Sequence, residues 1–265
     1  MNKVFQYQQS DIYYRVEGNG KAVVFIHGFG ENGSIWNNQV NYLKDYCKVI
    51  VPDLPGSGLS PMIKGQTTIE AYAETIYALL QHEQVEKCIM LGHSMGGYIT
   101  LSFAEKFPKL LTGFGLVHST AFPDTEEKKT NRIRGIEIMK EYGAYSFLKN
   151  TIPNLFSKKF KEEHPEQVDL LIEGAKPFTP EACAQYYLAM KDRVDKTSVL
   201  KETQLPVLFI IGTEDIAAPL SDLLQQVHLP NQSHLHILEG VGHMGMLEAP
   251  DVLNKYLLEF INDVK

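Results

Sequence analysis

The chain has only three cysteines among its 265 residues, Cys47, Cys88 and Cys183. They are too few and too scattered for a disulfide or zinc framework, so we expect free thiols in a reducing cytoplasm. No apolar run approaches the ~20 residues that span a bilayer. The polar N-terminal segment 1–11 also lacks the apolar core of a signal peptide. We therefore expect neither membrane insertion nor export.

Basic side chains are outnumbered as well, because 25 Lys and Arg stand against 32 Asp and Glu, a formal charge of −7. Neutralising phosphates needs a basic surface, so nucleic acid is not an expected partner. The apolar fraction of 44% and the charged fraction of 22% are ordinary for a globular protein and exclude disorder as the main state. The length allows one large α/β domain or two small ones.

Short apolar, β-rich runs alternate with helical patterns along most of the chain. The runs are nearly continuous, as in strands that are covered on both faces of a parallel sheet. Repeated β-then-α units predict a doubly wound sheet, in which ligands bind beyond the carboxyl ends of the strands. The expected strands are 22–26, 48–51, 88–91, 114–117, 207–211 and 234–238, preceded by an antiparallel pair, 4–8 and 12–17, closed by residues 18–20.

One stretch breaks this alternation. Residues 119–195 show helical patterns without a convincing strand, and five prolines divide the stretch into short helices. We interpret it as a helical insertion, a cap or lid, between two strands of a core formed by residues 1–118 and 196–265. Such a segment shapes the pocket beneath it.

The expected strand 88–91 leads into G-x-S-x-G at residues 92–96, between a strand and a helix. This is the context of a nucleophile elbow, in which a sharp turn lifts the hydroxyl of Ser94 clear of the backbone. The neighbouring chain passes so close on both sides that only small residues fit, which explains Gly92 and Gly96. Ser94 is therefore the candidate nucleophile.

A serine hydroxyl is a poor nucleophile without a base, and in this strand context the chain order is Ser, then Asp or Glu, then His. Glu214 and Asp215 both follow the strand 207–211, and either could orient the base. His243 follows the strand 234–238 in a glycine-rich loop and is the candidate base. The oxyanion hole is assigned to the backbone N–H groups of Phe29, after the strand 22–26, and Met95.

With these motifs in order, the chain resembles the α/β-hydrolase superfamily along nearly its whole length. The motifs are His-Gly-Phe-Gly at 27–30, Asp-Leu-Pro-Gly-Ser-Gly at 53–58, and the segments 92–97, 212–219 and 242–250. The resemblance implies an α/β-hydrolase fold, mostly parallel and doubly wound, with a helical cap insertion. It also implies that Asp215, four residues before a proline, completes the catalytic triad. Dehalogenase and epoxide-hydrolase branches carry aspartate where this chain has Ser94, so those activities are not favoured.

Two readings of other classes compete with a hydrolase. Residues 28–33 also match G-x-G-x-x-G, and Asp53 lies 20 residues beyond, which imitates a dinucleotide-binding fingerprint. That reading leaves Ser94, Asp215 and His243 unexplained. A non-catalytic ligand receptor on the same fold is the other alternative, and turnover of an activated ester would separate it from an esterase.

The favoured function is a serine esterase that cleaves a small or medium carboxylic ester, with no metal or organic cofactor implied. Phe122 and Phe147 of the insertion are candidate pocket residues, and His118, just after the strand 114–117, is either a pocket residue or a structural one. The alternative chemistry on the same triad is C–C, thioester or carrier-bound methyl ester cleavage. An acidic acyl-carrier protein is a possible partner for the lysines and arginines of the insertion, although acidic residues balance them.

Overall fold

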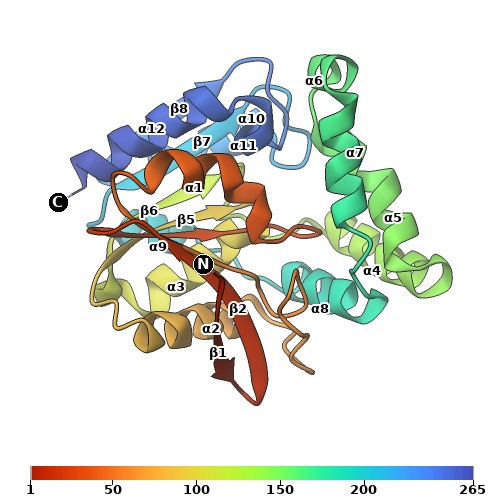
Figure 1. Ribbon diagram of the computed structural model, residues 1–265. Coiled ribbons are helices and arrows are strands. Elements are labelled where there is room, and N and C mark those ends of the chain that lie inside the picture. The colour runs from red at the N-terminus through yellow and green to blue at the C-terminus, as the bar shows by residue number, and fades with distance from the viewer. Residues whose placement is uncertain (1, 265) are drawn as a thin grey trace.

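The computed structural model describes residues 2–264, and its centre is an eight-stranded sheet with the order β1-β2-β4-β3-β5-β6-β7-β8 (Figure 1). The strands are β1 (Asn2–Tyr7), β2 (Ser10–Glu17), β3 (Ala22–Ile26), β4 (Lys48–Pro52), β5 (Cys88–His93), β6 (Leu111–Val117), β7 (Val207–Gly212) and β8 (Ser233–Leu238). Only the pairs β1–β2 and β2–β4 are antiparallel, and the pairs from β4 to β8 are parallel. The predicted mostly parallel sheet is confirmed.

Helices cover both faces of the sheet, which is why its central strands are apolar throughout. Every residue of β3, β5 and β7 is buried. Figure 1 shows α1 (Asn37–Leu43) and α12 (Pro250–Asp263) on one face and α2 (Ile69–His82), α3 (Met95–Lys106) and α9 (Thr197–Glu202) on the other. The remaining short core helices are η1 (Gly33–Trp36), η2 (Pro108–Leu110), α10 (Leu220–Leu224) and α11 (Gly245–Glu248).

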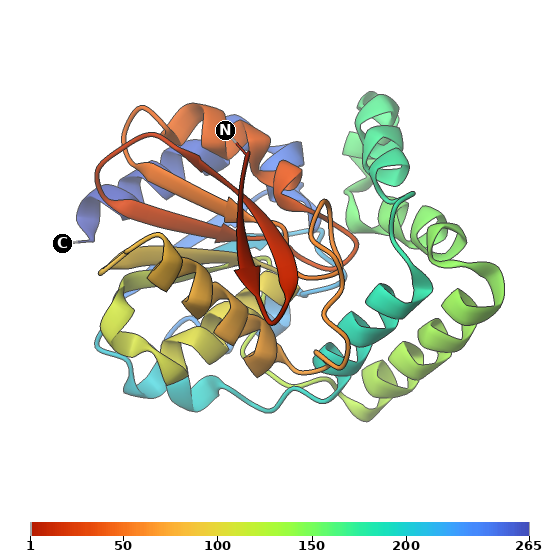
Figure 2. The ribbon, with the colours of Figure 1, turned by 60° about the horizontal axis from the view of Figure 1, so that its bottom comes forward.

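All regular elements between β6 and α9 are helices, as the sequence predicts for the insertion. They are α4 (Glu126–Tyr142), α5 (Ala144–Thr151), η3 (Ile152–Leu155), α6 (Lys158–Glu163), α7 (Pro165–Gly174) and α8 (Pro180–Lys191). Pro165 and Pro180 occupy first-turn positions, where a missing N–H costs nothing. Figures 1 and 2 show these helices, drawn in green, gathered on one side of the core; we call residues 119–195 the cap.

A buried charge cluster fastens the two segments that connect the cap to the core. The guanidinium of Arg193, on the returning segment, donates to Asp124 on the outgoing one at 2.6 Å, and Arg132 of α4 also donates to Asp124. Although burial alone raises the pKa of Asp124, the two guanidinium groups outweigh it and hold that pKa below its usual range. The N–H of Lys196 also donates to the Ala121 carbonyl at 2.9 Å. The two connections therefore behave as one unit.

The three cysteines are free and buried, as expected. Burial raises the pKa of both Cys88 and Cys183 to about 12, so these thiols are poor nucleophiles. Within residues 2–264, none of the helices combines the length and the apolar character that crossing a bilayer requires.

The first hairpin departs from expectation in its turn. Tyr7 pairs with Ser10, so the tight turn consists of Gln8 and Gln9, and residues 18–20 instead connect β2 to β3. Both glutamines have positive φ, 48° and 64°. Two-residue hairpin turns of this kind favour Asn-Gly because they need positive φ at both positions. Glutamine gives no sign of such a turn, which is why the sequence did not reveal it.

We predict that replacing Gln8→Asn and Gln9→Gly together stabilises the protein. Each residue is exposed and adopts a backbone conformation that glutamine disfavours, so the pair should raise the free energy of unfolding by about 1 kcal/mol. That corresponds to a Tm increase of about 2–3 °C for a domain of this size, measured by thermal denaturation. Gln9→Ala is the control and should give no increase, since alanine also disfavours positive φ. An equal gain from alanine would contradict the explanation.

Candidate active site

Ser94 lies in a strained turn between β5 and α3, with φ 50° and ψ −115°. A methyl group added to Gly92 would lie 2.1 Å from the Gly96 carbonyl oxygen, and one added to Gly96 would lie 2.3 Å from the Ile26 carbonyl oxygen. Neither position therefore tolerates a side chain, which confirms the steric argument for the two glycines. The Ser94 N–H donates to the Val117 carbonyl at 3.0 Å, which ties the turn to β6.

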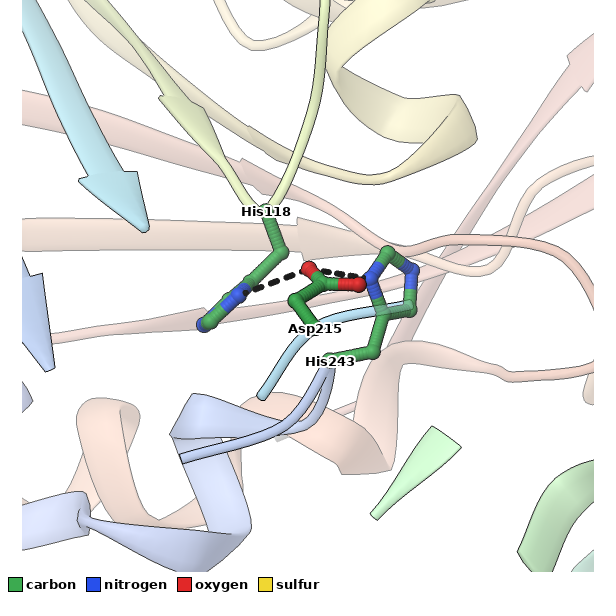
Figure 3. Close-up of side chains that lie close together, drawn as sticks. All are labelled: His118, Asp215 and His243. Carbon is green, nitrogen blue, oxygen red and sulfur yellow. Dashed lines mark hydrogen bonds and ion pairs between the residues drawn. The ribbon is translucent and has the colours of Figure 1, made fainter. Parts of the chain in front are cut away.

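Asp215 and His243 meet beyond the ends of β7 and β8. The distance from His243 Nδ1 to Asp215 Oδ2 is 2.8 Å (Figure 3). The other carboxylate oxygen, Oδ1, accepts from the N–H groups of Ala217 and Ala218 at 2.9 and 2.8 Å. Glu214 points elsewhere and accepts from the Lys158 N–H at 3.3 Å. Of the two acids that the sequence left open, the structure brings Asp215 to the histidine.

His118 also contacts this carboxylate, and here the expectation of a pocket residue is corrected. Its Nδ1 lies 3.2 Å from Asp215 Oδ2, the same oxygen that His243 uses (Figure 3). The His118 side chain is completely buried, and its ring lies against Gly245 of α11. A position after a strand locates the residue at the correct edge of the sheet but does not fix the direction of its side chain.

The charges in this cluster are mutually dependent. Burial alone raises the pKa of Asp215, but His243 and the hydrogen bonds from both histidines outweigh it and hold that pKa far below its usual range. Burial alone lowers the pKa of His243, yet the adjacent Asp215 carboxylate outweighs it and raises that pKa above its usual value. For His118, burial dominates and lowers the pKa. The arrangement therefore suits a neutral His118 and a His243 that readily accepts a proton.

The loop after β3 lies beside Ser94. A methyl group added to Gly28 would be 3.2 Å from Ser94 Cβ, and the ring of the following residue, Phe29, packs on Tyr187 of α8 with centroids 4.5 Å apart. Met95 is the first residue of α3, where backbone N–H groups have no helical acceptor. Met95 therefore follows Ser94 directly in the chain, and the neighbour of Phe29 in the loop after β3 lies beside the serine side chain.

Sequence reasoning missed a second buried pair, Glu31 and His93. Glu31 Oε2 accepts from the Gly28 N–H at 2.8 Å and lies 3.0 Å from His93 Nδ1. His93 Nε2 lies 2.9 Å from the carbonyl oxygen of His243. The pair thereby connects the loop after β3 to the loop of His243. The available signal was that His93 directly precedes the candidate nucleophile.

Glu248 holds the loop of His243 from the other side. Its carboxylate accepts from the N–H groups of Gly242 and Met244 at 3.1 Å and from Ser157 of the cap at 3.0 Å. The N–H of His243 itself donates to the Leu155 carbonyl at 2.6 Å. The histidine backbone is therefore fixed jointly by core and cap. In the sequence Glu248 was only part of a motif, and its role was not predicted.

Two alternative ligand sites can be judged from geometry. Asp53, the acid of the dinucleotide-like fingerprint, accepts from the N–H groups of Gly33 and Leu59 at 2.8 and 2.9 Å, so it braces its own loops. His118, Asp215 and His243 form a group whose possible metal-ligating atoms lie within 4.8 Å of one another. Those atoms are already joined by the two hydrogen bonds to Asp215 Oδ2.

The two predicted pocket aromatics are placed differently. Phe147 of α5 packs edge-on against Tyr187 with centroids 5.8 Å apart, so it continues the aromatic contact that begins at Phe29. Phe122 is half-buried in the connection to the cap, where its carbonyl accepts from Arg193 at 3.2 Å. Among the aromatic contacts of the described residues, Phe122 is not part of this group.

The chain is similar to known hydrolases over its whole length. A family model described as alpha/beta hydrolase fold matches residues 21–140. A solved thermophilic esterase from Thermogutta terrifontis, with malate bound, has a TM-score of 0.94 at 29% identity and covers 100% of this chain and 99% of its own. The 3-oxoadipate enol-lactonase 2 of Acinetobacter baylyi is 27% identical over 88% of this chain and 85% of its own. The pimeloyl-[acyl-carrier protein] methyl ester esterase of Wigglesworthia glossinidia brevipalpis is 26% identical over 94% and 97%, respectively.

The fold, the order of motifs and these similarities agree: the chain has the α/β-hydrolase fold, and it is similar to esterases and lactonases of that superfamily. It is an enzyme, a hydrolase that acts on esters or related substrates. This identification replaces the dinucleotide-binding interpretation of residues 28–33.

We predict that His243 titrates above the ordinary histidine pKa of ~6.5 and that Asp215→Asn reverses the shift. The substitution removes the negative charge that raises the pKa, while burial, which lowers it, remains. The pKa of His243 should therefore fall below the ordinary value in the variant. The pKa of His243 is measured by histidine NMR titration of both proteins. Identical His243 titration in the two proteins would contradict the electrostatic description of the site.

Proposed function

We propose that the protein is a serine hydrolase that cleaves small or medium carboxylic esters through an acyl-enzyme. The observation that carries this proposal is the 2.8 Å contact between His243 Nδ1 and Asp215 Oδ2, at the same edge of the sheet as the strained elbow of Ser94. An acid that fixes a neutral histidine and stabilises its charged form, beside a serine hydroxyl, is the arrangement that activates serine.

In the proposed mechanism the Ser94 hydroxyl oxygen attacks the ester carbonyl carbon while His243 Nε2 takes the hydroxyl proton. Asp215 keeps the proton of the imidazole on Nδ1 and stabilises the imidazolium that forms. His243 then gives its proton to the departing alkoxide, and the alcohol leaves. A water molecule repeats the sequence on the acyl-enzyme, which releases the acid and restores Ser94.

The negative charge that develops on the carbonyl oxygen is assigned to the N–H groups of Phe29 and Met95. Each such donor is worth roughly 2.7–4 kcal/mol in comparable enzymes. The proposal is supported by the closeness of Gly28 to Ser94 Cβ and by the position of Met95 as the first residue of α3. Glu31 contributes indirectly, because its carboxylate fixes the Gly28 N–H.

Apolar cap residues favour an acyl group of limited size. Phe29, Tyr187 and Phe147 form a continuous aromatic wall from the oxyanion loop to α5. Cavities of about 180 and 220 Å³ lie along the seam between the core and α7, and both are lined by Asn32 and Gly174. The smaller cavity also reaches Gly30 and Leu247, which flank the oxyanion loop and the His243 loop.

The structure gives less support to a substrate bound to a carrier protein than to a small free ester. Arg132 is committed to Asp124 and lies over the Tyr187 ring, and Lys129 pairs with Glu126 at 2.8 Å. These side chains do not form an open basic surface for an acidic carrier. The enol-lactonase and carrier methyl esterase relatives nevertheless make lactones and methyl esters sensible members of a substrate panel.

The proposed roles predict a ranking of variants. Ser94→Ala should reduce turnover of p-nitrophenyl esters at least ~10³-fold and abolish labelling by a fluorophosphonate. Asp215→Asn should cost about 10⁴-fold because it favours the wrong histidine tautomer. Glu214→Gln is the matched control and should change little, since Glu214 contacts Lys158 and not His243. Undiminished turnover in Ser94→Ala, or a larger loss for Glu214→Gln than for Asp215→Asn, would overturn the assignment.

The cap predicts a limited acyl length. Each methylene buried in an apolar pocket contributes ~0.8 kcal/mol, so kcat/KM should first rise along a series of p-nitrophenyl esters. Chains that exceed the pocket must displace cap helices at a cost of about 1–3 kcal/mol, so we expect a maximum at about C4 to C8. Phe147→Ala should move the maximum to longer chains and leave acetate turnover nearly unchanged. Phe122→Ala, outside the aromatic wall, is the comparison; activity that still rises at C16 would refute a closed pocket.

A further inference from the structure

Two residues near the carboxylate cluster share an unusual backbone conformation. Among the described residues other than glycine, those with positive φ are Gln8, Gln9, Gln84, Ser94 and His118. The three glutamines are exposed, whereas His118 is completely buried and has φ 49°. A strained conformation in a packed interior persists only where the surroundings impose it, and such positions cluster at functional sites.

Three hydrogen bonds accompany the strained backbone conformation of His118. The His118 N–H extends the sheet by donating to the Ile210 carbonyl at 2.9 Å, and its Nδ1 then reaches Asp215 Oδ2 at 3.2 Å. The hydroxyl of the next residue, Ser119, donates to the Ser94 carbonyl at 2.7 Å. The segment 118–119 therefore contacts the candidate acid with one side chain and the candidate nucleophile with the next.

The protonation state of His118 follows from its surroundings. An ionised Asp215 offers only acceptors, so the proton of the His118 ring must be on Nδ1. Its Nε2 is buried and has no hydrogen-bond partner within the described residues. A methyl group added to Gly245 would lie only 2.4 Å from this nitrogen. A second proton on Nε2 would thus be buried without an acceptor, which disfavours the charged form.

We propose that His118 is a positioning residue for the catalytic acid: as a neutral donor it supplies the fourth hydrogen bond to Asp215 and fixes the carboxylate against His243. This inference rests on the proposed function of Asp215 and His243. The other three bonds come from Ala217 and Ala218 on Oδ1 and from His243 on Oδ2. Without His118, the oxygen that faces His243 has a single partner, and the carboxylate can turn.

Neutrality is essential to this role. A charged imidazole at position 118 would repel the imidazolium of His243, whereas a neutral donor leaves the charge of Asp215 available to it. The other ionisable groups around His243 are Glu31, Glu248 and His93. None of them contacts Asp215 Oδ2. The rings of His118 and His243 also lie edge to face with centroids 5.8 Å apart, so a variant that keeps a ring at position 118 isolates the effect of the hydrogen bond to Asp215.

The test compares His118→Phe with His118→Asn. Phenylalanine retains the ring but removes the donor, and asparagine retains an N–H near the position of Nδ1 and tolerates positive φ. We expect His118→Phe to lower kcat at least about tenfold, the effect of losing a charge-assisted hydrogen bond, with KM nearly unchanged. Its pH–rate limb should move to higher pH, because an Asp215 with fewer donors attracts a proton on His243 more strongly. His118→Asn should restore both values.

The outcomes that overturn the proposal are equally specific. They are a folded His118→Phe with wild-type kcat and pH limb, or a folded His118→Asn that is as impaired as His118→Phe. Folding is checked by thermal denaturation. If His118→Phe does not fold, ¹⁵N NMR of the wild-type protein decides: a neutral ring protonated on Nδ1 supports the inference, and an imidazolium or a ring protonated on Nε2 refutes it.

This experiment separates the inference from the proposed function. Turnover that survives Ser94→Ala or Asp215→Asn removes the serine mechanism, and His118 then has no catalytic acid to position. Turnover that needs both residues but is indifferent to His118→Phe leaves the serine mechanism intact and removes only the role of His118.

Discussion

The active-site edge of this protein depends on one buried negative charge, the carboxylate of Asp215. A buried carboxylate is tolerated only when hydrogen bonds replace its hydration. Here two backbone N–H groups and two histidines supply them, from the loops after β6, β7 and β8. Because these strands are neighbours in the sheet order, their carboxyl ends deliver all the partners to one point. The fold therefore supplies the hydrogen bonds that offset the cost of burying this charge. The charge in turn raises the pKa of His243.

Two other carboxylates near Asp215, those of Glu31 and Glu248, also accept hydrogen bonds from backbone N–H groups. Glu31 joins the Gly28 N–H to His93, and Glu248 joins the His243 loop to the Ser157 N–H of the cap. Each acid accepts backbone N–H groups from a loop that carries no regular structure of its own. In these loops the carboxylates accept the backbone N–H groups that neighbouring strands would accept in a sheet. The hydrogen bonds fix the backbone of the loops that carry the candidate oxyanion hole and the candidate base.

These contacts also explain what the sequence could predict. The elbow is a local steric problem, so Gly92, Ser94 and Gly96 reveal it directly, and the buried strands of a parallel sheet appear as apolar runs. The contacts of His93 and His118 are different, because their partners Glu31 and Asp215 lie in loops 62 and 97 residues away along the chain. A pattern of residue types locates the strand edge at which such side chains lie. It does not determine whether they face the substrate or one another, which is why the sequence leaves His118 open as a pocket residue or a structural one.

The cap does more than cover the site, because its residues form hydrogen bonds with the loop that carries His243. Leu155 accepts the hydrogen bond of the His243 N–H, and Ser157 shares Glu248 with the same loop. The Asp124 cluster fastens both connections of the cap to the core. A motion that lifted η3 would break the hydrogen bonds that hold His243, so access for a substrate that leaves the base in place must lie elsewhere. The smaller cavity beside α7 reaches Gly30 and Leu247, and neither Leu155 nor Ser157 lines it, so this side of the boundary between cap and core is separate from the bonds that hold His243.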